Sequence, residues 1–144
     1  MSKKRRSVYL LIAGILQLIL SFICMFFGVI GLAATLTIID MIIDQRIQQQ
    51  LIISISALAA FALGFTGGIQ TIKQTRLPLA ITGILSIISW NIYSIFYSLK
   101  IIPQNSGDII IWLAIVIFLT ILACISLTFI ITSRNEFERR GKKE

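Results

Sequence analysis

The sequence predicts an all-α membrane protein, a four transmembrane helix bundle with both termini in the cytoplasm, and three observations predict it. Of the 144 residues, 57% are hydrophobic and only 13% are charged, whereas soluble domains average about 45–50% apolar and about 25% charged residues. The charged residues gather at the two ends of the chain and between long uncharged stretches. Each stretch supplies the roughly 20 apolar residues that a helix needs to cross a bilayer core about 30 Å thick.

Four segments meet this length criterion, at about residues 8–30, 51–72, 77–99 and 109–132. A secretory signal peptide is the alternative for the first segment, because basic residues precede it. The apolar part of a signal peptide is only about 7–15 residues long, however, and this uncharged run continues from Val8 to Ile39. We therefore expect a retained helix, and a chain that forms one four-helix transmembrane domain.

Residues 31–50 are too long for a plain turn between the first two segments. Apolar residues recur there at four-residue spacing (Ile39, Ile43, Ile47) beside a polar row (Asp40, Asp44, Gln48). This periodicity indicates an amphipathic helix, so we expect an amphipathic outer extension that emerges from the membrane or lies on its outer surface. A simpler interpretation is that the extension is a helical overhang that packs on the second helix. We favour this interpretation over a surface-bound amphipathic helix.

Basic residues near the span ends predict the orientation, because the side richer in Lys and Arg is cytoplasmic. Of the 13 basic residues, only Arg46 and Lys100 fall on one side of the predicted spans. The other side receives Lys3, Lys4, Arg5, Arg6, Lys73, Arg76, Arg134, Arg139, Arg140, Lys142 and Lys143. Both termini are therefore expected in the cytoplasm, where this basic collar attracts anionic membrane lipids. Because topology accounts for the net charge of +7, no nucleic-acid partner is predicted.

Small and polar side chains recur along the first helix at alternating steps of three and four residues. They are Gly14, Gln17, Ser21, Cys24, Gly28, Gly31 and Thr35. In lipid, helices associate where small residues let their backbones approach, since the lipid tails are as apolar as leucine. We therefore expect this seam, which has the heptad spacing of a coiled coil, to face another helix.

The second helix has a comparable ridge at four-residue spacing, made of Ser56, Ala60, Gly64 and Gly68. Two interpretations are open: the ridge meets another helix of the same chain, which we favour, or it mediates dimerisation or partner binding.

The third helix carries hydroxyl and aromatic residues on one face, namely Thr82, Ser86, Ser89, Tyr93 and Tyr97. Asn91 points the other way, and we expect it to be a hydrogen-bonding pin between helices. The alternative is a pocket lined by Trp90, Asn91 and Tyr93.

Groups that most chemistry needs are missing from the predicted spans. The chain has no His, and Cys24 and Cys124 stand alone in separate apolar segments, where cysteine is usually a small packing residue. No Asp, Glu, Lys or Arg lies inside a span, whereas ionisable groups there usually mark proton or ion paths. We therefore predict no enzyme activity, no cofactor and no metal site.

The general layout resembles small tetraspan membrane proteins of low-GC Gram-positive bacteria. The resemblance rests on the basic start, a short basic turn, a charged tail and the glycines Gly14, Gly28, Gly31, Gly64, Gly67 and Gly68. It implies a cell-membrane location and no defined activity. Small four-helix drug exporters are similar in size, but that family depends on a membrane-embedded Glu in the first helix, where this chain offers only Gln17.

Three functional hypotheses follow. The leading one is an interaction protein (an accessory subunit, assembly factor or immunity-type factor) that packs against another membrane protein or against a second copy of itself. The second is a small channel or transporter with an uncharged polar pore, lined by the hydroxyl face of the third helix. The third is a membrane-permeabilising protein of the holin type.

Overall fold

The computed structural model describes residues 3–38, 45–101, 107–135 and 137. These residues form four helices and no strand: α1 (Lys3–Ile38), α2 (Gln45–Lys73), α3 (Leu77–Ile101) and α4 (Gly107–Thr132). Each helix contains a segment that is long and apolar enough to cross a membrane. The predicted all-α fold with four helices able to span a membrane is confirmed.

The residues of the predicted outer extension belong to the two long helices on either side of it. Residues 31–38 continue α1 and residues 45–50 begin α2, while residues 39–44 lie outside the described residues. The last turns of α1 stay packed on α2, because Thr35 is buried and Gly31 lies directly against the Ser54 hydroxyl. The α1 helix therefore contacts α2 beyond the end of its predicted span.

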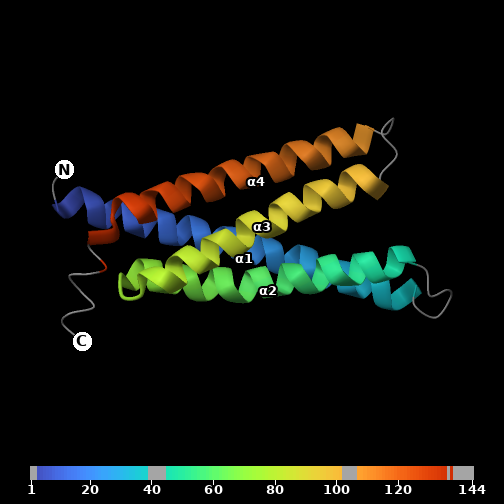
Figure 1. Cartoon of the computed structure of the whole chain (residues 1–144), viewed down its shortest axis with the longest axis horizontal. Helices are drawn as coiled ribbons and strands as arrows, with labels where there is room; N and C mark the ends of the chain where they lie inside the picture. The colour runs from blue at the N-terminus through green and yellow to red at the C-terminus, as the bar shows by residue number, and fades with distance from the viewer. Residues whose placement is uncertain (1–2, 39–44, 102–106, 136, 138–144) are drawn as a thin grey trace.

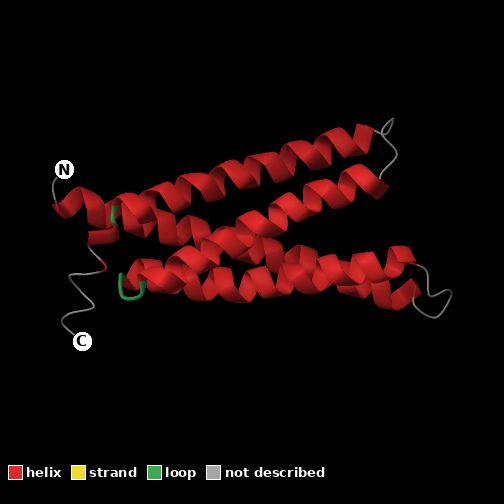
Figure 2. Ribbon diagram, viewed as in Figure 1, coloured by secondary structure: helices red, strands yellow, loops and turns green. Residues whose placement is uncertain are grey.

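The four helices form two pairs that diverge toward one end of the molecule. The α2–α3 turn, the start of α1 and the end of α4 share one end, here called the turn end (Figures 1 and 2). At this end α1 lies beside α4, and Tyr9 stacks on Phe129 with ring centroids 5.1 Å apart. Toward the opposite end, the far end, α1 stays beside α2 while α3 runs beside α4, so that the two pairs separate (Figure 1).

The α2–α3 turn is short because its backbone makes one sharp reversal. Gln74 adopts a left-handed conformation with φ of 57°, which is the usual way for a residue just past a helix end to redirect the chain. The Thr75 N–H donates a hydrogen bond to the Gln70 carbonyl over 3.3 Å. Pro78 then lies in the first turn of α3, where its missing N–H has no helical partner to lose.

Small side chains are buried throughout the bundle, beside large ones such as Leu20 and Ile87, and many further large apolar side chains lie on its surface. Ala13, Ala57, Ala80 and Ala123 are each at most 1% exposed, whereas Phe26, Phe96 and Ile110 are more than 60% exposed. Burial of small residues with large apolar residues outside is the arrangement expected of helices that pack in lipid.

Candidate functional site

The small-residue seam of α1 faces α2. Six of its seven residues are buried, and Gly31 is half-buried. A methyl group added to Gly14 would lie 3.1 Å from the Gly68 carbonyl oxygen, and one added to Gly28 would lie 3.1 Å from the Ser54 carbonyl oxygen. Because these neighbours are backbone atoms, the two helices approach as closely as glycine permits.

The ridge of α2 also meets helices of the same chain. Ala60, Gly64 and Gly68 are buried, and Ser56 is partly buried. A methyl group on Gly64 would lie 3.0 Å from the Ser21 Cβ atom of α1 and 2.7 Å from the Ile87 Cδ1 atom of α3. The ridge therefore sits where α1, α2 and α3 come together.

A close helix crossing joins Gly67 of α2 to Gly83 of α3. A methyl group on either glycine would lie 3.0 Å from the other glycine's Cα atom. It would also meet a backbone carbonyl oxygen, that of Leu79 at 2.7 Å from Gly67 or that of Leu63 at 2.6 Å from Gly83. Sequence reasoning missed this crossing, because Gly83 is isolated on α3 and belongs to no spaced pattern.

Gln17 links three helices at this crossing. Its Nε2 donates a hydrogen bond to the Ala80 carbonyl of α3 over 3.2 Å. Its Oε1 lies 3.1 Å from the Thr71 hydroxyl of α2, whose one hydrogen is shared with the Gly67 carbonyl 2.8 Å away. The side chain is fully buried, so both ends of its amide are satisfied inside the protein. A side-chain amide does not gain or lose a proton at physiological pH. Gln17 therefore holds the helices together but cannot carry a proton.

Two further interhelical hydrogen bonds come from residues that the sequence did not single out for this role. The Ser126 hydroxyl of α4 donates to the Ala13 carbonyl of α1 over 3.0 Å. The Trp90 indole Nε1 donates to the Ile53 carbonyl of α2 over 3.2 Å. Asn91 is buried in the bundle, but its Nδ2 has no hydrogen-bond partner among the described residues. The pin expected at Asn91 is thus made by its neighbour Trp90.

The hydroxyl face predicted on α3 turns toward the outside of the bundle. Thr82, Ser89 and Tyr93 are exposed, and Ser86 and Tyr97 are partly buried. A pocket lined jointly by Trp90, Asn91 and Tyr93 does not form, because Tyr93 is 39% exposed while Asn91 is buried.

Besides a concave site at the α2–α3 turn, lined by Thr75, Arg76, Leu77, Pro78, Leu79 and Phe137, two concave sites lie along the helices. The first, here called the far-end cavity, has a volume of about 340 Å³ and receives residues from all four helices. It is lined by Phe27, Gly31, Gln50, Ile53, Ser54, Ala57, Trp90, Ser94, Tyr97, Ser98 and Trp112.

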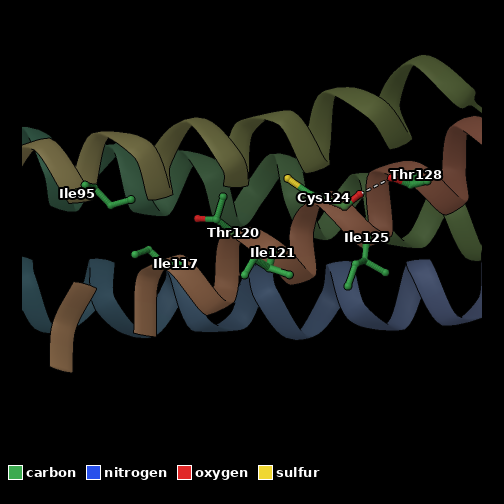
Figure 3. Close-up of a pocket in the computed structure, with 7 residues that line it drawn as sticks. All are labelled: Ile95, Ile117, Thr120, Ile121, Cys124, Ile125 and Thr128. Atoms are coloured by element: carbon green, nitrogen blue, oxygen red, sulfur yellow. Dashed lines mark hydrogen bonds between the residues drawn. The ribbon is translucent and has the colours of Figure 1, made fainter. Parts of the chain in front are cut away.

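The second site, here called the α4 groove, is a shallow depression of about 330 Å³ on the outer surface between α3 and α4. Figure 3 shows Thr120 and Cys124 directed from α4 toward the side of Ile95 on α3, with Ile121 and Ile125 pointing the other way. Ile117 and Thr128 complete the lining.

No candidate metal-binding site is found in the part of the chain that the structure describes. Within those residues, no group of three potential His, Cys, Asp or Glu ligands comes together. Cys24 is buried and Cys124 is exposed, and both are free thiols.

No protein-family model, curated protein or solved structure matches this chain. The class of protein therefore follows from the fold itself. Four helices able to cross a bilayer, with many large apolar side chains exposed on the outside, define a multi-pass membrane protein.

Proposed function

We propose that this protein is an integral membrane interaction protein, such as an accessory subunit, an assembly factor or an immunity-type factor. It binds a transmembrane helix of another membrane protein in the α4 groove. The observation that carries the proposal is the row of small residues Thr120, Cys124 and Thr128, which lies open on the surface of α4 at four-residue spacing.

The polar atoms of this row support binding of an apolar helix. The Thr120 hydroxyl donates to the Val116 carbonyl over 2.8 Å, and the Thr128 hydroxyl donates to the Cys124 carbonyl over 2.9 Å. With the hydroxyl hydrogens bonded inside α4, the row presents methyl groups and a thiol to a partner. Such short side chains let the backbone of another helix approach closely.

The small-residue faces of α1 and α2 are already occupied, which supports α4 as the helix that binds a partner. The seam of α1 and the ridge of α2 already meet helices of the same chain. In contrast, only 22% of the residues in the most apolar stretch of α4 are buried, against 33% to 39% in the corresponding stretches of the other three helices. Among the described helices, α4 therefore has the most surface left for a partner.

The photo-crosslinking amino acid p-benzoylphenylalanine, placed at Ile121 in intact membranes, tests the proposal. Ile121 lines the groove and is 53% exposed, but it points away from the row of Thr120 and Cys124 (Figure 3), so the probe leaves that row open. We expect a discrete adduct that joins this chain to a different membrane protein, absent without ultraviolet irradiation. Adducts with lipid only would contradict the proposal. A product of twice the chain mass would show that the groove binds a second copy of this chain in place of a different protein. A ladder of larger homo-oligomers would favour the channel hypothesis.

We further propose that the protein lies in the cell membrane with both termini in the cytoplasm. The distribution of basic residues supports this orientation, because the segment around Lys3–Arg6 and the α2–α3 turn with Lys73 and Arg76 are at the same end of the bundle (Figure 1). In contrast, Lys100 is in the last turn of α3 at the far end.

Labelling of single cysteines tests this orientation. On a background without the two native cysteines, a membrane-impermeant maleimide should label Gln49→Cys and Ser106→Cys in intact cells. Ser2→Cys and Gly141→Cys should be labelled only after the membrane is opened. Labelling of Ser2→Cys from outside would reverse the proposed orientation.

A further inference from the structure

The far-end cavity forms because the two helix pairs diverge. The α3–α4 pair separates from the α1–α2 pair toward the far end (Figure 1), and the cavity of about 340 Å³ takes its lining from both pairs. This volume lies in the range of about 300–1,000 Å³ that is typical of small-molecule sites. No residue of its lining carries a charge at neutral pH.

One polar atom in the cavity wall has no partner. Ser54 and Ser98 each donate a hydrogen bond to a carbonyl one turn earlier, of Gln50 and Ser94 respectively, over 2.8 Å. Ser94 is only 1% exposed, yet its Oγ makes no hydrogen bond to any described residue. A buried hydroxyl without a partner is costly, so Ser94 marks the point where a ligand's polar atom would bind.

A second unpartnered polar group, the Asn91 amide, lies about one helical turn before Ser94 on α3. Asn91 precedes it by three residues, and residues at this spacing share a helix face. Its Nδ2 is also buried without a partner among the described residues. Asn91 is not among the residues that line the cavity, so the polar contact offered to a ligand is the Ser94 hydroxyl, which can donate or accept a hydrogen bond.

The aromatic residues of the cavity form a wall. Phe27 lies between the two tryptophans, with its ring centroid 6.0 Å from that of Trp90 and 5.0 Å from that of Trp112, the latter at 90°. A quaternary ammonium group needs rings arranged around it within about 6 Å. These rings instead pack against one another, and they present a continuous apolar surface suited to an uncharged body.

We propose that the far-end cavity binds an uncharged amphiphile taken from the bilayer, whose hydroxyl or carbonyl head bonds to Ser94 while its apolar body lies on the Phe27–Trp112 wall. The neutral lining disfavours a charged head, because no counter-charge is present to offset its desolvation. The inference rests on the cavity and is independent of the α4 groove.

Tryptophan fluorescence reports on this cavity directly, because the chain has only two tryptophans and both line it. The purified protein in detergent micelles is titrated with ω-bromoundecanol, whose bromine quenches nearby indoles. We expect saturable quenching that unbrominated undecanol reverses by competition. At equal micellar concentration, ω-bromoundecanoate and bromododecane should quench weakly and without saturation.

Two matched serine variants show whether the head binds at Ser94. Ser94→Ala should weaken ω-bromoundecanol binding about tenfold through loss of the hydrogen bond. Ser98→Ala should stay within about twofold of wild type, because the Ser98 hydroxyl is already bonded to the Ser94 carbonyl. Without ligand, Ser94→Ala should melt at the same temperature as wild type or higher, since it removes an unpartnered hydroxyl.

Several results would overturn the proposal. Quenching that rises linearly with micellar probe in all variants would mean partition only. Stronger saturable quenching by ω-bromoundecyl-trimethylammonium would make the cavity a cation site. Equal affinity of wild type and Ser94→Ala, in a variant that melts normally, would remove Ser94 from the site.

Discussion

Replacing Gly83 by alanine is expected to destabilise the bundle by about 2 kcal/mol, whereas the same replacement at Gly107 should have little effect. In a helix, Gly→Ala usually stabilises by about 1 kcal/mol. At Gly83, however, the added methyl group would lie 2.6 Å from the Leu63 carbonyl oxygen and 3.0 Å from the Gly67 Cα atom. Both neighbours are backbone atoms, so the clash is relieved only if α2 and α3 move apart.

Gly107 is the matched control, because nothing lies within 4 Å of a methyl group added there. The measurement is loss of helicity on heating in a mild detergent, for wild type and both variants. Separation of α2 from α3 would also disturb Gln17, whose Nε2 lies at the same crossing and bonds to Ala80. Equal melting of Gly83→Ala and wild type would contradict the backbone contact between the two helices.

The helices and the inward face of α1 could be predicted because both depend on periodic features of the sequence. Long uncharged segments predict spans from length alone, and the four observed helices contain them. The seam from Gly14 to Thr35 alternates regularly between steps of three and four residues, so the helix face that it occupies is defined before any partner is known. Its burial in the structure follows from close approach to α2.

Contacts that depend on the register between two helices could not be predicted in this way. The Gly67–Gly83 crossing joins an isolated glycine on α3 to one glycine of a cluster on α2. Similarly, Asn91 and Trp90 are neighbours in the sequence, and both are plausible hydrogen-bond donors. Only the packed structure places the Trp90 indole against the Ile53 carbonyl and leaves the Asn91 Nδ2 without a partner.

The α4 groove and the far-end cavity differ in how far each could be predicted from the sequence. The row Thr120, Cys124 and Thr128 has the same four-residue spacing as the α2 ridge, so a signal for the α4 groove was present but not recognised. The sequence cannot show which small faces are used inside the chain and which stay open. The far-end cavity depends on the divergence of two helix pairs (Figure 1), which no local pattern encodes.

Filling the α4 groove is expected to abolish partner binding without unfolding the protein. Cys124→Phe places a large ring in the row that Thr120 and Thr128 flank, so a partner helix could no longer approach closely. Because Cys124 is exposed, its replacement creates no clash in the core. Ile111→Phe is the control, since Ile111 is 63% exposed on the same helix and its position along the helical repeat places it on a different side.

The most direct measurement is the molar ratio of the crosslink-identified partner to this protein after purification in mild detergent. The account predicts a fixed ratio for wild type and Ile111→Phe, and a decrease of at least about tenfold for Cys124→Phe, the loss of roughly 1.4 kcal/mol of binding. All three proteins should melt at similar temperatures. An unchanged ratio for well-folded Cys124→Phe would contradict a partner helix in the α4 groove.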